Sequence, residues 1–203
     1  MRSTMRIVVP GILAVLVPIA AVAGEPRRHD GGFFLRLAPG GGFSRSYIEE
    51  DGERFGFKGT SGSFDIAIGA MVTENFAVHG TLGGWSIVDP TIQFLDVEEQ
   101  VDDASITMTM YGGGFTYYLG QSNTYITASA GAAMLNTEFL GESEDSETGF
   151  AVDAGLGKEW WVSDRWGLGV SATAGYHSIP PGDPEAPNFK GPSFAVRFSA
   201  TFN

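Results

Sequence analysis

The end of the sequence places the tightest limit on the fold. Over residues 193–203, apolar side chains occupy every second position, namely Phe194, Val196, Phe198, Ala200 and Phe202. Successive side chains of a β-strand point to opposite faces, so these five share one face and Arg197 lies on the other. The pattern predicts a strand with an apolar environment on one side and water or a polar partner on the other.

The first residues predict a secretory signal peptide over residues 1–23. Arg2 and Arg6 precede an uncharged run from Ile7 to Val22, and Ala21-Val22-Ala23 gives the small-x-small pattern of a cleavage site. Cleavage between Ala23 and Gly24 would release the mature chain. The alternative is a retained N-terminal anchor helix.

After this run, no stretch is apolar and long enough to cross a bilayer as a helix, although 43% of the residues are hydrophobic. A membrane-spanning chain of this kind must therefore use strands. Unpaired backbone groups in hydrocarbon cost several kcal/mol each, so the sheet has to close on itself. The chain has 29 Gly and no Cys, which excludes disulfides and thiolate chemistry.

Runs of alternating or Gly-interrupted apolar residues predict eight strands. They lie at 32–46, 60–71, 76–88, 104–119, 124–138, 149–162, 166–179 and 191–202. The connections at 72–75, 120–123 and 163–165 are short and have turn compositions. Those at 47–59, 89–103, 139–148 and 180–190 are longer and polar. Short turns at one rim and long loops at the other are typical of outer-membrane barrels.

Two segments carry a more specific resemblance, Met110–Gly120 and Gly157–Leu168. They resemble hairpins of the generic outer-membrane β-barrel domain, and the whole layout is similar to the small eight-stranded barrels of Gram-negative bacteria, the group of the OmpA membrane domain, OmpX and OmpW. The resemblance implies an all-β, eight-stranded antiparallel up-and-down transmembrane β-barrel with short periplasmic turns and longer extracellular loops. Residues 32–203 would form this domain and residues 24–31 an N-terminal periplasmic segment.

The same resemblance implies the location and the partners. The chain would lie in the cell outer membrane, in contact with outer-membrane lipid and lipopolysaccharide. Phe198 and Phe202 resemble the C-terminal signal that the barrel-assembly machinery reads, and here Asn203 follows Phe202.

Strand alternation assigns seven ionisable side chains to the lumen. With large apolar residues facing lipid, the inward set is Arg36, Asp65, His79, Asp153, Glu159, His177 and Arg197. An eight-stranded barrel is only wide enough to be filled by side chains, so we expect these charges to pair across a plugged lumen. A gated or narrow conduit and a site with its own chemistry are the alternatives. The Gly112-Gly113-Gly114 run predicts a bulge in its strand.

Aromatic residues beside the short turns predict a periplasmic girdle. Its expected members are Trp160, Trp161, Trp166, Tyr117 and Tyr118. The alternative is a soluble, lipocalin-like barrel in which these rings form the core and the charged residues face solvent.

The formal net charge of −12 is concentrated in the expected long loops. Such a surface excludes nucleic acid as a partner. Glu98, Asp102, Glu144 and Asp145 are weak candidates for binding divalent cations shared with lipopolysaccharide phosphates; the alternative is solvated loops. No metal-loop motif is present, and no cofactor is predicted.

Catalysis finds little support in the sequence. His177 and Ser178 are neighbours in a strand and point to opposite faces, so His177 cannot activate Ser178. The sequence therefore predicts a non-enzymatic barrel with a structural or surface-interaction role. An OmpW-like conduit for small hydrophobic molecules, with a pocket at Trp85, Ile87, Phe94 and Leu95, is the alternative, and a lipid A-modifying enzyme is the remote one.

Overall fold

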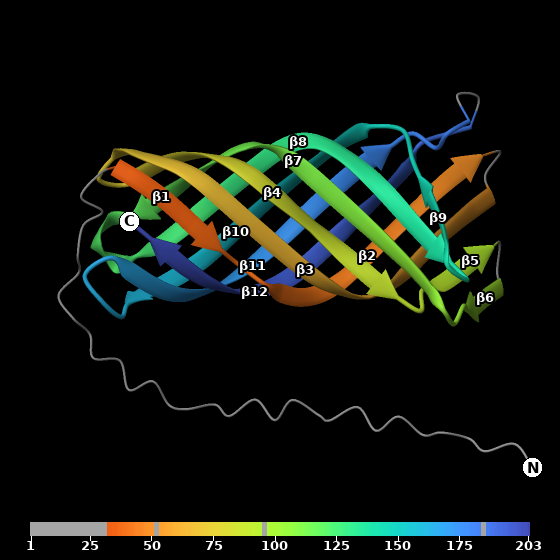
Figure 1. The fold of residues 1–203 in the computed structure, drawn as a ribbon, viewed down its shortest axis with the longest axis horizontal. Helices are drawn as coiled ribbons and strands as arrows, with labels where there is room; N and C mark the ends of the chain where they lie inside the picture. The colour runs from red at the N-terminus through yellow and green to blue at the C-terminus, as the bar shows by residue number, and fades with distance from the viewer. Residues whose placement is uncertain (1–31, 51–52, 95–96, 184–185) are drawn as a thin grey trace, which may run out of the picture.

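The chain forms a barrel of antiparallel strands, seen in a computed structural model (Figure 1). The structure describes residues 32–50, 53–94, 97–183 and 186–203. The predicted signal peptide at 1–23, its cleavage site and the segment 24–31 lie outside these residues. Within the described part, no helix is long and apolar enough to cross a membrane.

Twelve strands and one short 3-10 turn make up the described structure. In chain order they are β1 (Gly32–Leu37), β2 (Gly40–Glu50), β3 (Glu53–Thr73), β4 (Phe76–Val88), β5 (Thr91–Phe94), β6 (Val97–Gln100), β7 (Ala104–Leu119), η1 (Gly120–Ser122), β8 (Thr124–Phe139), β9 (Glu142–Asp145), β10 (Gly149–Trp161), β11 (Trp166–Ile179) and β12 (Phe189–Phe202).

Nine of these segments form the eight strands of the closed wall, because β1 and β2 together act as one strand. The ladder runs β12–β11–β10–β8–β7–β4–β3. Both β1 and β2 then pair with β12 on one side and β3 on the other, so the sheet returns on itself. Ala38 and Pro39 separate the two pieces, since Pro has no N–H to donate to the ladder. The predicted eight-stranded antiparallel barrel is confirmed.

Three of the four expected long loops contain strand segments, and the first two are mostly strand. β2 and β3 continue past the wall as a hairpin that pairs as far as Glu50 and Glu53. The second loop contains the hairpin β5–β6, whose β5 also pairs with β3, and the third contains β9, which pairs with β8. Polar composition did not distinguish strands from loops in these segments, because a strand outside the membrane does not need an apolar face.

The glycine run of β7 is regular, so the predicted bulge is wrong. Gly112, Gly113 and Gly114 keep an unbroken register with β4 and with β8. The register shift of the structure instead lies between Met71 and Thr73, at the short turn that joins β3 to β4.

The outer surface of the wall is apolar and the interior holds the charges. Exposed side chains on the outside include Ile68, Leu156, Phe194, Val196 and Phe198. Arg36, Glu159 and Arg197 are buried inside. This arrangement is the opposite of a soluble barrel, in which the apolar face would point inward.

Candidate functional site

All seven predicted ionisable residues face the barrel interior, but they do not form one network. Arg36, His79, Glu159, His177 and Arg197 are buried, while Asp65 and Asp153 are half-buried. Asp65, Asp153 and Arg197 lie nearer the middle of the barrel, and Arg36, His79 and Glu159 lie nearer the short turns; we call these six the polar belt. His177 lies apart, toward the extracellular end.

One ion pair lies at the centre of the belt. Arg197 on β12 contacts Asp153 on β10 through both terminal nitrogens, at 3.2 and 3.4 Å. Its Nε donates to Ser63 Oγ at 3.3 Å. Asp65 lines the same small cavity, which has a volume of about 20 Å³ and is also lined by Trp85. That volume holds about one water molecule.

Arg36 is held by rings and a hydroxyl rather than by a carboxylate. Its guanidinium lies 4.8 Å from the centre of the Tyr125 ring and 5.7 Å from that of Phe34. Nη2 donates to Thr127 Oγ1 at 3.0 Å, and Nη1 has no hydrogen-bond partner among the described residues. The expectation that every lumen charge pairs with another is therefore wrong for Arg36. Cation–π contact with two rings supplies part of the stabilisation instead.

His79 sits in the middle of a chain of hydroxyl groups. Its ring nitrogens contact Thr81 Oγ1 at 2.9 Å and Thr116 Oγ1 at 3.1 Å. Thr116 continues to Thr127, which in turn accepts from Arg36. The side chains of β1, β4, β7 and β8 are thereby linked across the lumen.

Glu159 is also satisfied by neutral groups. Thr201 Oγ1 donates to it at 2.6 Å and the Tyr118 hydroxyl at 3.1 Å. Tyr118 is therefore a buried lumen residue, so its assignment to the girdle is wrong. Because Tyr117 faces lipid, alternation sends Tyr118 inward.

Two apolar clusters fill the rest of the lumen, and the sequence reasoning missed both. The periplasmic cluster comprises Phe34, Ala67, Met71, Ala77, Tyr118 and Tyr125. The extracellular cluster comprises Phe57, Trp85, Ile87, Ile106, Met108, Met110, Ala133, Leu135, Ala151 and Ile179, with Phe189 packed against it. Trp85 and Ile87, predicted to line a pocket at the mouth, are thus part of this filled cluster. Phe94 is exposed on β5, and Leu95 lies outside the described residues.

His177 has a hydroxyl partner that the sequence did not indicate. Its Nε2 contacts Ser46 Oγ on β2 at 2.8 Å, and its ring centre lies 5.6 Å from that of Trp85. His177 Nδ1 has no hydrogen-bond partner in the described part of the chain, so nothing there orients the imidazole as a catalytic base. Ser46 is 0% exposed, which keeps it from a substrate.

The aromatic residues near the short turns divide between the two faces. Tyr117, Trp160 and Trp166 are exposed on the outside of the wall. Trp161 pairs with Gly167 and follows the outward-facing Trp160, so it belongs to the inward face of β10 at the rim. The girdle therefore has fewer members than predicted on this rim.

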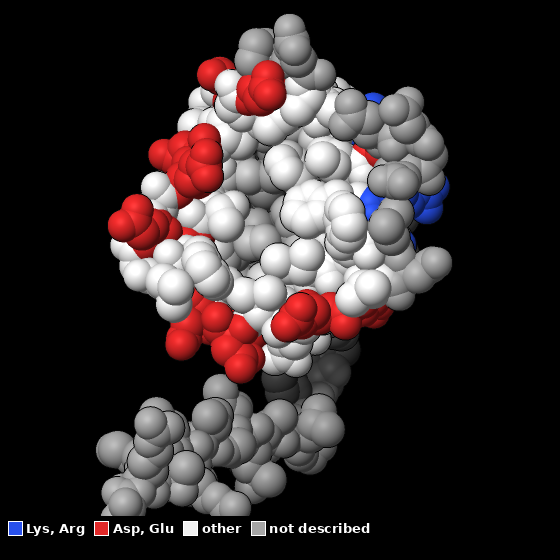
Figure 2. All heavy atoms as spheres, turned by 90° about the vertical axis from the view of Figure 1, so that its right-hand side faces the viewer, with Lys and Arg blue, Asp and Glu red and all other residues white. Residues whose placement is uncertain are grey.

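The extracellular rim carries most of the exposed acids (Figure 2). Glu98 pairs with Lys58 at 2.7 Å, and Asp145 accepts from Asn136 at 2.8 Å. Among the described residues, which include the four candidates Glu98, Asp102, Glu144 and Asp145, no acidic or histidine group is arranged to hold a metal ion. The rim is better described as a set of charged hairpins.

Comparison with known proteins assigns this barrel to a family. The model of the outer membrane protein beta-barrel domain matches residues 12–202. The chain belongs to this family. No curated protein sequence matches it significantly.

Neisserial surface protein A shares the fold of this chain at low sequence identity, and two further solved structures show a weaker similarity. Neisserial surface protein A has a TM-score of 0.57 and 11% identity, over 86% of this chain and 99% of that one. OprG from Pseudomonas aeruginosa has a TM-score of 0.46 and 11% identity, covering 89% and 100% of the two chains. Ail from Yersinia pestis has a TM-score of 0.41 and 14% identity, covering 82% and 98%.

Proposed function

We propose that this protein is a closed-lumen barrel of the outer membrane with a structural or surface-interaction role and no enzymatic activity. The observation that carries the proposal is the filled lumen. Two apolar clusters and the polar belt, which contacts the periplasmic cluster directly, fill the lumen. A barrel of eight strands is wide enough only for such a filling.

The extracellular hairpins are the surface that would meet partners. They extend the wall beyond the membrane at β2–β3, β5–β6 and β9 (Figure 1). Phe94, Val97 and Leu140 are exposed there, at 55%, 65% and 71%. Exposed apolar side chains on an otherwise charged rim favour contact with another macromolecule.

Planar-bilayer recordings and dye uptake test the closed lumen. The refolded protein should give no discrete conductance steps, and vesicles containing it should not take up a hydrophobic dye faster than empty vesicles. Steps of defined size would overturn the closed lumen. Dye uptake without conductance would favour the conduit for small hydrophobic molecules.

Mass spectra of lipid A test the absence of activity. Cells with and without the protein should show the same acylation pattern. Loss or transfer of an acyl chain that is abolished by Ser46→Ala would overturn the non-enzymatic proposal, because Ser46 is the hydroxyl that contacts His177.

A further inference from the structure

Four basic side chains gather on one side of the extracellular rim, and we call them the basic patch. They are Arg45 on β2, Arg54 and Lys58 on β3, and Lys190 on β12. The register places Arg45 opposite Lys58, and Lys190 opposite Tyr47. The other described Lys and Arg lie in the lumen or at the short-turn rim. Figure 2 shows basic side chains on one side of a largely acidic rim.

The basic patch faces the outside of the barrel, not the lumen. Ser44 and Ser46, which alternate with Arg45 and Tyr47 along β2, are buried inside. Alternation therefore directs Arg45 and Tyr47 outward. Phe43 lies on the same face two residues earlier and is 47% exposed among the lipid-facing side chains.

Two of the four bases are free of carboxylate partners among the described residues, and the other two are loosely held. Arg54 pairs with Glu49 at 3.1 Å and Lys58 with Glu98 at 2.7 Å, but both pairs are substantially exposed. Such pairs contribute little, so a phosphate can compete for the bases. The acids of the hairpin tip lie about four residues, or about 13 Å, beyond Arg45.

Tyr47 orients the guanidinium groups. Arg45 and Arg54 lie 5.4 and 5.3 Å from the centre of its ring. Arg45 also donates to the Gln93 side chain at 3.2 Å, a neutral partner that leaves its charge uncompensated. Stacked guanidinium groups retain the planar fork that binds phosphate oxygens in pairs.

The depth of the basic patch matches a lipid headgroup. Arg45 is two residues beyond Phe43, or about 7 Å along the strand, and about 5 Å along the membrane normal for a strand tilted by about 40°. The headgroup region extends about 5–8 Å beyond the hydrocarbon core. An anion carried by a lipid is therefore the ligand that this position favours.

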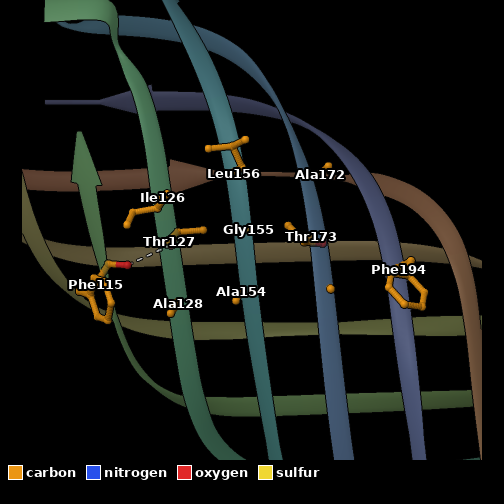
Figure 3. Close-up of a pocket in the computed structure, with 11 residues that line it drawn as sticks. Phe115, Ile126, Thr127, Ala128, Ala154, Gly155, Leu156, Ala172, Thr173 and Phe194 are labelled. Carbon is orange, nitrogen blue, oxygen red and sulfur yellow. Dashed lines mark hydrogen bonds between the residues drawn. The ribbon is translucent and has the colours of Figure 1, made fainter. Parts of the chain in front are cut away.

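An apolar trough in the wall lies next to the basic patch. The register aligns Phe115, Ala128, Ala154, Ala174 and Phe194 across β7, β8, β10, β11 and β12, so three small side chains lie between two rings (Figure 3). The trough has a volume of about 570 Å³.

β12 contributes to both the trough and the basic patch. Phe194, at the edge of the trough, lies four residues after Lys190, or about 13 Å along the strand, and both side chains are exposed on the same face of the strand. A hydrocarbon chain in the trough would thus extend from a headgroup at the basic patch.

We propose that the basic patch and the trough bind one phosphorylated glycolipid of the outer leaflet, the lipid A part of lipopolysaccharide. A phosphate contacts Arg45 and Lys190, Lys58 and Arg54 add charge, and an acyl chain occupies the trough. This site goes beyond the proposed function and does not depend on whether the lumen conducts.

Native mass spectrometry of the full mature protein, refolded in detergent, tests the site. The probes are bisphosphorylated lipid A, the same lipid A without phosphates, and phosphatidylglycerol. The double variant Arg45→Gln/Lys190→Gln should bind bisphosphorylated lipid A at least about tenfold more weakly than the wild type. Lys158→Gln/Arg165→Gln, which removes two charges at the opposite rim, should bind as the wild type does.

A separate variant tests whether an acyl chain occupies the trough. Ala154→Phe fills the space between Phe115 and Phe194 and should weaken binding of lipid A with or without phosphates, since it acts on the acyl chain. Heat-modifiable mobility on a gel verifies that each variant is folded. Lys190→Gln alone serves if the double variant does not refold, with a smaller loss in the same direction.

Each remaining outcome overturns the site as proposed. Equal binding by the patch variant and the wild type, or equal losses in the patch and the opposite-rim variants, removes the basic patch. Equal binding of lipid A without phosphates removes the phosphate contact, and equal binding of phosphatidylglycerol makes the ligand a general anionic lipid. Dimers that disappear in Ala154→Phe would assign the trough to a second copy of this chain.

Discussion

At the scale of single residues, the Arg197–Asp153 pair is the lumen contact whose loss has the largest expected cost. Asp153→Asn leaves the Arg197 charge in the belt without its acid, which should lower the free energy of unfolding by about 3 kcal/mol. The double variant Asp153→Asn/Arg197→Gln should recover part of this loss, because neither member of the pair is then left without its partner. Urea unfolding in micelles, followed by Trp fluorescence, measures both changes.

A surface pair provides the control for that prediction. Lys58→Gln breaks the exposed contact with Glu98 and should change the free energy of unfolding by less than about 1 kcal/mol. If Asp153→Asn were as mild as Lys58→Gln, the ion pair would have no structural role in the lumen.

Gly157 is needed because the Tyr125 ring lies against its backbone. A Cβ at this position would overlap the Tyr125 ring. Gly157→Ala should therefore displace Tyr125 from Arg36 and cost about 1–3 kcal/mol. Gly62→Ala is the matched control, since a Cβ there meets no atom within 4 Å. Equal unfolding midpoints for the two variants would contradict the prediction.

Alternation along the strands made the lumen charges predictable and left other lumen residues undetected. The inward positions of Arg36 and Arg197 follow from their period-two neighbours alone. Tyr118 was misplaced because its closeness to a turn was given more weight than its alternation with Tyr117. Trp85 was assigned to a pocket at the mouth and not to a packed lumen. It lies on the inward face of β4, because Leu82 and Gly84 lie on the outward face. The contact between His177 and Ser46 joins distant strands, and no local pattern indicates it.

At the scale of the elements, the two kinds of connection should lie on opposite sides of the membrane. An epitope inserted between Leu140 and Gly141, at the turn between β8 and β9, should be labelled on intact cells. The same epitope inserted between Glu74 and Asn75, at the turn between β3 and β4, should be labelled only after the outer membrane is permeabilised. The reason is that barrels of this family place their short turns in the periplasm.

The reverse labelling pattern would show that the barrel is inserted in the opposite orientation. It would also place the basic patch in the inner leaflet, where lipid A is absent.

The strand count and the order of the hairpins were predictable because each wall strand has its own alternation. The hairpins beyond the wall were not, since their pairing depends on polar strands whose sequences resemble loops.

At the scale of the whole molecule, Phe202 joins the two ends of the wall. Its ring centre lies 5.3 Å from that of Trp166 and 6.2 Å from that of Phe33. Phe202→Ala should lower the free energy of unfolding of the refolded barrel by about 2 kcal/mol, because these contacts are lost at a partly exposed site. Phe198→Ala, at a side chain 67% exposed to lipid, should leave it nearly unchanged.

Measuring assembly in cells distinguishes the packing role of Phe202 from a role of Phe198 and Phe202 as an assembly signal. Both substitutions should reduce the fraction of heat-modifiable protein in the outer membrane if Phe198 and Phe202 are read by the assembly machinery. A loss seen only for Phe202→Ala would attribute the effect to packing alone.

The break at Ala38 and Pro39 has a consequence for how the ring forms. Nine residue pairs join the first wall strand to β12, three through β1 and six through β2, whereas fourteen join β11 to β12. The first and last strands are also the pair farthest apart in the chain, so their meeting has the largest entropic cost and is expected last. The closing seam therefore has fewer paired residues than the neighbouring β11–β12 seam. We expect the first wall strand and β12 to separate first when the barrel is heated or pulled.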